Sequence, residues 1–182
     1  DSACARRLGA GGGAAHLVGL LRAVAVEKTG ALLPADVFHA LSAVFNLIRV
    51  TAIKRYAVEE ARLPEWLGAV MAMSESAKGN RDVQYVGLAC AKELLEGPWC
   101  DAASRMLRES GFVDALLRNV TKFEDDTETV TACDSIAETL EVDIHSKYGL
   151  GRTVGPGGFS IKSKEKRVFD EGIFDKAPNK TV

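Results

Sequence analysis

Residues 62–73 read RLPEWLGAVMAM, and two other segments of the chain follow the same pattern. GAAHLVGLLRAV begins at Gly13 and GFVDALLRNVTK begins at Gly111, so successive starts are 49 residues apart. Each segment has apolar residues three and four positions apart, the spacing that gives a helix one buried face. These apolar positions are Leu17, Leu20, Leu21, Leu63, Leu67, Val70, Phe112, Leu116 and Val120. Equal spacing of similar helices predicts an internal repeat.

A second helical segment follows each of the first three, at residues 36–48, 83–95 and 128–140. The three segments align with offsets of 47 and 45 residues when one polar position in each is matched. These matched polar residues are Asn46, Glu93 and Glu138. The same alignment brings together three small residues, Ala40, Gly87 and Ala132. Small side chains at one position of a helix predict close approach by another helix.

Shorter amphipathic segments precede the second and third units, TAIKRYAVEEA at 51–61 and CDAASRMLRES at 100–110. Pro34, Pro64 and Pro98 lie at or near the expected helix starts, where the missing N–H of proline does no harm. Glycines fall at the junctions between segments, as helix-terminating glycines do. These are Gly30, Gly79, Gly97 and Gly111. The body of the chain therefore reads as triplets of short, medium and long helices, repeated about two and a half times.

Specific residues of these triplets resemble the armadillo-repeat family. AVEEARLPEWLGAVMAM at 57–73, followed by DVQYVGLACAKELL at 82–95, is similar to that family's acidic-Ala turn, "G-x-[IL]-P-x-L-V-x-L-L" and "V-Q-x-x-A-x-x-A-L-x-N-L". RESGFVDALLRNV at 108–120 repeats the turn and second helix, and ALSAVFNLI at 40–48 carries the "A-L-x-x-L-x-N-L" ending. The resemblance covers roughly residues 10–143. It implies an all-α fold, a short right-handed α-solenoid of two and a half to three helix triplets.

The resemblance also implies a binding groove. In armadillo proteins that hold extended peptides, the third helices line a concave surface, where asparagines bond the peptide backbone and tryptophans clamp its side chains. Asn46 matches the asparagine, whereas Glu93 and Glu138 replace it in the next two units. The tryptophan position is occupied by Ser42, Ala89 and Asp134, so the ladder that binds nuclear signals is largely absent. The two glutamates are either acceptors for a basic segment, through charge-assisted hydrogen bonds, or solvated carboxylates on an exposed face.

The glycine-rich start of the chain has a competing interpretation. LGAGGGAAHLVGLLRAVAVEK, residues 8–28, satisfies the loose dinucleotide-binding form G-x-G-x-x-G/A. That motif requires a hydrophobic strand before its first glycine, and DSACARRL at 1–8 is polar and short. We therefore expect residues 1–12 to be a flexible lead-in to a helical domain at 13–145, with no cofactor bound.

Candidate catalytic and metal-binding residues are scattered. His16, His39 and His145 have no further ligand at metal-binding spacing, and the serines lack nucleophile-elbow glycines. The acidic pairs at 59–60 and 125–126 fit an exposed helix face and a helix start better than an acid–base pair. The tryptophans, Trp66 and Trp99, are expected to be packed or part-buried aromatic residues rather than groove anchors. The sequence therefore predicts neither an enzyme nor a metal site.

The cysteine spacing and the charge distribution limit the cellular compartment and the classes of partner that we expect for this chain. The four cysteines form no C-x-x-C pair, which predicts free thiols in a reducing intracellular compartment, cytoplasmic or organellar. No run of 18 uncharged apolar residues occurs, so no membrane span is expected. The net charge of −2 combines an acidic body with residues 146–182, which carry eight Lys/Arg against four Asp/Glu. An acidic helical body argues against a nucleic-acid-binding core.

Residues 146–182 are expected to form an extended, irregular C-terminal arm. Five glycines fall between Gly149 and Gly158, together with Pro156, and no helical periodicity follows them. Three phenylalanines recur in the otherwise polar remainder, namely Phe159, Phe169 and Phe174. They are candidate anchors that dock into pockets, with chance aromatics in a disordered tail as the alternative.

Together these features predict a non-catalytic interaction protein. Two and a half repeats leave the terminal units with an exposed core face, which suggests capping by a partner or by the arm. We expect an accessory or scaffold subunit of a larger intracellular assembly, anchored by the arm to other protein subunits and without a small-molecule substrate. Two alternatives remain open: an adaptor that binds a basic peptide in the acidic groove, and a helical-repeat protein associated with nucleic acid through KSKEKR at 162–167.

Overall fold

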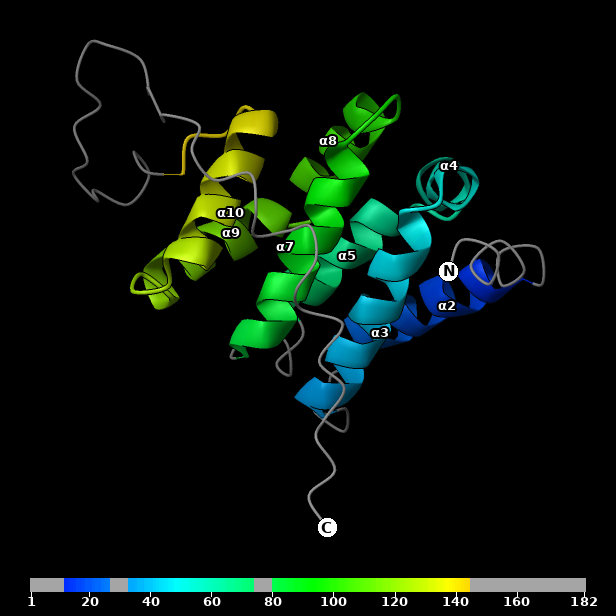
Figure 1. The fold of residues 1–182 in the computed structure, drawn as a ribbon, viewed down its shortest axis with the longest axis horizontal. Coiled ribbons are helices and arrows are strands. Elements are labelled where there is room, and N and C mark those ends of the chain that lie inside the picture. Colours follow the sequence, from blue (N-terminus) through cyan, green and yellow to red (C-terminus); the bar gives the residue numbers. More distant parts are fainter. Residues whose placement is uncertain (1–11, 27–32, 74–79, 145–182) are drawn as a thin grey trace. The chain divides into compact units, whose positions relative to one another are not determined.

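The computed structural model describes residues 12–26, 33–73 and 80–144, and within these ranges the protein is all-α, with eight helices packed together (Figure 1). The helices are α2 (Gly13–Val26), α3 (Pro34–Ile48), α4 (Thr51–Glu59), α5 (Leu63–Met73), α7 (Arg81–Leu95), α8 (Cys100–Glu109), α9 (Phe112–Lys122) and α10 (Thr127–Thr139). Each lies within a few residues of a segment that the sequence predicts to be helical. The predicted arm, and the predicted lead-in apart from Gly12, lie outside the described residues.

Equivalent helices of successive units contact one another. The long helices α3, α7 and α10 pack in that order, and the medium helices α2, α5 and α9 do the same. The short helix α4 contacts α8. In Figure 1, α3, α7 and α10 lie beside one another, coloured from blue through green to yellow. Helices that the sequence aligns with one another are thus in contact in the described part of the chain.

One continuous hydrophobic core joins the helices. Its largest fully buried side chains are Phe112, Leu21, Leu41, Ile48, Leu63, Leu67, Met71, Leu88, Leu94, Leu107, Leu116 and Ile136. Seven apolar positions that the repeat predicts to be buried are buried: Leu21, Leu63, Leu67, Val70, Phe112, Leu116 and Val120. The side chains of Leu17 and Leu20 lie outside the described set. The predicted buried face is confirmed for the part of the chain that can be compared.

The predicted close approach is confirmed at Gly87, and the two alanines aligned with it are buried. Ala40 and Ala132 are each 5% exposed, and a Cβ added to Gly87 would lie 2.0 Å from the Met71 sulfur. Met71 is fully buried on α5, so any side chain at position 87 on α7 would require its thioether to move. The long and medium helices of the second unit therefore meet at a contact that depends on a missing side chain.

Local signals set the helix boundaries. Pro34 is the first residue of α3 and Pro64 the second residue of α5, where no backbone hydrogen bond is lost. The Asn80 side chain accepts from the Val83 N–H at 3.0 Å and caps α7. Gly97 and Gly111 adopt positive φ values of 93° and 83° at the junctions around α8, a conformation that glycine adopts without strain.

Long cationic side chains bind backbone carbonyls near the C-terminal ends of neighbouring helices. Lys54 of α4 donates to the Glu93 carbonyl at 2.8 Å, and Arg108 of α8 donates to the Leu140 carbonyl at 3.0 Å. Arg118 of α9 donates to the Met71 carbonyl in the same way. The last carbonyls of a helix lack the usual intrahelical donors, so these cations add hydrogen bonds at the negative end of each helix; the Glu93 carbonyl also accepts from the Glu96 N–H at 3.3 Å. In the second and third units the short helix thereby fixes the end of the long one.

Candidate functional site

The face formed by α3, α7 and α10 carries the groove residues that the sequence predicts. The matched positions 42, 89 and 134 lie one turn before positions 46, 93 and 138 on the three helices, so each set forms a row across the packed helices. Of the first row, Ser42 and Asp134 are half-buried and Ala89 is 8% exposed. The middle residue of this row, Ala89, therefore has a small and buried side chain.

The three predicted groove residues are placed differently. Asn46 is exposed, but its side-chain N–H donates to the Ser42 carbonyl of its own helix at 2.9 Å. Glu93 forms an ion pair with Lys54 of α4, and the two side chains are 19% and 11% exposed. Glu138 is exposed, and its carboxylate has no hydrogen-bond or ion-pair partner among the residues of the described ranges. Of the three, Glu138 is therefore the free anionic acceptor on this face.

A third row on the same face was missed by the sequence interpretation. Phe38, Tyr85 and Val130 lie eight residues before Asn46, Glu93 and Glu138 and are all half-buried. Burial raises the pKa of the Tyr85 hydroxyl, and the nearby carboxylates of Glu128 and Asp126 raise it further. The same alignment that matches the polar row also matches these residues, so the signal was present in the sequence. The missing information was that the row stays partly open to solvent.

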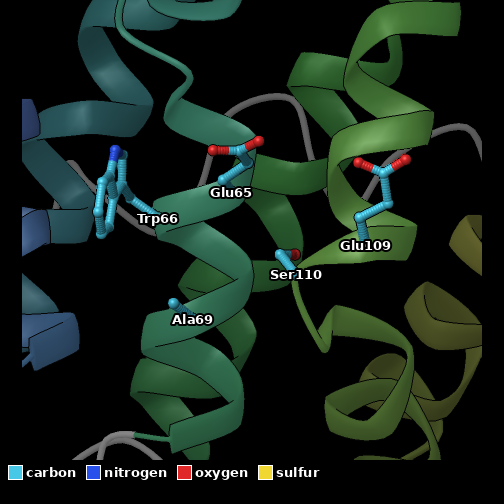
Figure 2. A pocket seen from close by; sticks show the side chains of 5 residues that line it. All are labelled: Glu65, Trp66, Ala69, Glu109 and Ser110. Atoms are coloured by element: carbon cyan, nitrogen blue, oxygen red, sulfur yellow. The ribbon is translucent and has the colours of Figure 1, made fainter.

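A separate hollow of about 260 Å³ lies between α5 and the junction of α8 with α9. Its lining residues are Glu65, Trp66, Ala69, Glu109 and Ser110, shown in Figure 2. Beside the hollow, Gly68 lets α5 come close to the junction: a Cβ at Gly68 would lie 1.7 Å from the Ser110 hydroxyl oxygen. The Ser110 hydroxyl donates to the Leu107 carbonyl at 2.9 Å, and this hydrogen bond orients the Ser110 side chain at the hollow.

The two tryptophans are half-buried and packed against the core, as predicted. The Trp99 indole N–H donates to a Glu59 carboxylate oxygen at 2.9 Å. The guanidinium carbon of Arg22, on α2, lies 5.1 Å from the centroid of the Trp66 ring, a cation–π contact. Both rings therefore carry charged partners from other helices at their outer sides.

The remaining candidate groups of the described residues are the buried cysteines and two histidines. Burial raises the pKa of the Cys90 thiol, with a smaller contribution from Glu93, and raises that of Cys133 to about 12, with a contribution from Asp134. Such thiols stay protonated and unreactive at neutral pH. His16 and His39 are exposed on different helices, and within residues 12–26, 33–73 and 80–144 no three His, Cys, Asp or Glu side chains are placed to hold a metal ion. His145 and the predicted arm anchors Phe159, Phe169 and Phe174 lie outside the described residues.

Comparisons with family models, curated proteins and solved structures find no match to this chain. No single helix in the described ranges is long and apolar enough to cross a membrane. The pair α3 and α4 meets the length and composition only when both helices are counted together, and the pair is bent by 115°.

Proposed function

We propose that the chain is a non-catalytic, armadillo-like interaction protein whose face on α3, α7 and α10 binds a segment of another protein. In this proposal the rows of like helices are a short right-handed α-solenoid of about two and a half triplets. The order of contacts, α3 to α7 to α10 and α2 to α5 to α9, supports it, because stacked triplets bring equivalent helices together.

The observation that carries the proposal is the match between rows on this face. Three helices each present a half-buried apolar or aromatic residue and, two turns later, a polar residue, as Phe38 and Asn46 do on α3. Partly exposed aromatic side chains give an interface contact area at low cost in conformational entropy. A segment that crosses the three helices would contact the apolar row with one side and the polar row with the other.

The charge of α10 favours a segment with a basic residue at that end. Glu138 is free and exposed, and Glu128 is also exposed on the same helix. Glu93 contributes less, because Lys54 already neutralises it. An adaptor for a basic peptide is therefore one form of the proposed function. In this form the glutamates of α10 select the peptide, in place of a row of asparagines along the three helices.

We propose further that this interaction makes the chain an accessory subunit of a larger assembly, with the C-terminal arm as its second attachment. Phe159, Phe169 and Phe174 remain the residues we expect to anchor the arm.

Selection of linear peptides from a displayed library against the full chain tests the proposed face. Val130→Ser should weaken the selected peptides about fivefold, since it removes apolar contact area from the row. Val113→Ser is the matched control, because Val113 is a half-buried valine on α9, away from this face. Equal affinity for the two variants, or failure to select any peptide, would contradict the proposal.

A further inference from the structure

We propose that Lys54 determines which side chain the binding face accepts over α7, because it occupies the central acidic position of that face with a cation of the chain's own. We base this on the proposed function, since the position lies on the same face of α3, α7 and α10. The ligand class that follows is a segment with one basic residue over α10 and an uncharged residue over α7.

Lys54 reaches Glu93 from a helix outside the face. Its ammonium group donates to a Glu93 carboxylate oxygen and, at 2.8 Å, to the Glu93 carbonyl. Lys54 lies on α4, Glu93 lies on α7, and both side chains are largely buried. The ammonium therefore holds the place that a basic residue of a ligand would take. A ligand cation could enter only by leaving this largely buried ammonium without its partner, which is costly.

The third unit lacks an equivalent cation. The short helical segments 51–61 and 100–110 align with an offset of 49 residues, so Ala103 of α8 is equivalent to Lys54 of α4. Ala103 is fully buried and uncharged. The alignment therefore predicts that the glutamate of the third unit has no cation from its short helix.

The third unit's glutamate has the state that this difference predicts. Glu138, which the repeat aligns with Glu93, is exposed and has no hydrogen-bond or ion-pair partner in the described part of the chain. Arg108 of α8 does reach the end of α10, but its hydrogen bond goes to the Leu140 carbonyl. One difference between two aligned short helices thus separates a neutralised glutamate from a free one.

The polar row consequently has an uneven charge along the face. Asn46 is uncharged, Glu93 is neutralised by Lys54, and Glu138 is a free carboxylate. Proteins often gain specificity from a group that disfavours the wrong ligand as well as from one that attracts the right ligand. Here Glu138 attracts the first basic residue, and Lys54 disfavours a second one.

Peptide selection on variants of the full chain tests the role of Lys54. The wild type should select linear peptides with one basic position from a displayed library. Lys54→Met should select peptides with two basic positions, and Lys at the second position should strengthen binding to this variant about fivefold over Gln. Glu93→Gln leaves the ammonium without its carboxylate, so this variant should select an acidic residue at the second position.

Arg55→Met is the matched control. Arg55 is the neighbouring cation on α4, and its exposed side chain pairs with Glu59 of the same helix. Peptides selected by this variant should keep one basic position. A general loss of stability would weaken all peptides alike, without changing the preferred residue at one position. Identical preferences in the wild type, Lys54→Met and Glu93→Gln would overturn the inference alone, whereas a wild type that selects no peptide would contradict the proposed function and the inference with it.

The wild type supplies a test that holds even if Lys54→Met does not fold. Lys is placed at each position of a selected peptide in turn, and the affinity of each peptide is measured. Gln at the basic position should weaken binding about threefold, the effect of one exposed ion pair. Lys at the other positions should bring no such gain. A second position at which Lys strengthens binding as much would show that Lys54 does not restrict the face.

Discussion

The Asp126 carboxylate caps the first turn of α10 and at the same time pairs with the guanidinium of Arg81, the first residue of α7. As a cap, it accepts from the Thr129 hydroxyl at 2.7 Å and from the Thr129 N–H at 3.5 Å. The pair joins the starts of two neighbouring long helices, so it fixes how the rows on α7 and α10 align. The sequence interpretation expected these acids to favour the start of the last helix, and for Asp126 this is confirmed.

Asp126→Ala should lower the free energy of unfolding by about 1–2 kcal/mol, mainly because the helix cap is lost. Chemical denaturation of the full chain measures the change. Asp125→Ala is the control, since Asp125 is the exposed neighbour of the cap and should change stability by less than about 0.5 kcal/mol. If the two variants are equally stable, the cap contributes nothing.

The same carboxylate predicts a pH dependence. The hydrogen bond from Arg81, supported by Thr129, lowers the pKa of Asp126 to about 2, against about 3.9 in an unfolded chain. The stabilisation is therefore complete above the unfolded value and is lost as the pH falls through about 2. The difference in unfolding free energy between wild type and Asp126→Asn should be constant above about pH 5 and shrink between pH 4 and 2. A difference that stays constant down to pH 2 would show that the pKa is not lowered.

The ion pair of Lys54 with Glu93 should be sensitive to removal of one partner. Lys54→Met should cost about 2–3 kcal/mol, because it leaves the largely buried Glu93 carboxylate without its cationic partner and removes one of the two donors to the Glu93 carbonyl. The cost should fall below that of a fully buried pair, since the Glu93 side chain is 19% exposed. The double variant Lys54→Met with Glu93→Met should recover part of the loss, and a denaturation cycle measures the coupling. Additive losses would show that the two side chains do not interact.

Gly68→Ala should destabilise the fold by about 1–3 kcal/mol through overpacking. The added methyl would lie 2.6 Å from the Ser110 Cβ, and that atom cannot rotate away. Ser110→Gly in the same chain should restore part of the stability by removing the clash. Thermal or chemical unfolding of the wild type, the single variant and the double variant measures these changes, and a Gly68→Ala variant as stable as the wild type would contradict the close contact of α5 with the junction.

Most helices were predictable because their signals are local. The apolar spacing that gives α5 and α9 their buried faces, and the proline and glycine residues at their ends, act within a few residues along the chain. Gly87 was predictable as a contact because small residues recur at one aligned position. The contact of Gly87 with Met71 was not predictable, because the repeat pattern does not indicate which side chain packs against the glycine.

Whether each predicted groove residue is paired or free depends on contacts between segments that are far apart in the sequence. Glu93 is neutralised because α4 places Lys54 at the end of α7, 39 residues away in sequence. The buried hydrogen bond from Asn119 to Gln84, at 2.9 Å, likewise joins α9 to α7 and has no local signature. The hollow beside Trp66 lies between α5 and the α8–α9 junction, which are about 40 residues apart in sequence, and the close contact of Gly68 with Ser110 there has no local signature either. Pattern alone therefore aligned the polar positions of α3, α7 and α10 but did not indicate how each of them is paired.

If α3, α7 and α10 present one binding face, backbone NMR of the full chain with a selected peptide will reveal it. We expect saturable shifts confined to these three helices, around Phe38, Tyr85 and Val130 and extending to Glu138. Shifts centred on α4, α8 or the outer sides of α2, α5 and α9, with α7 and α10 unaffected, would contradict the proposed binding face.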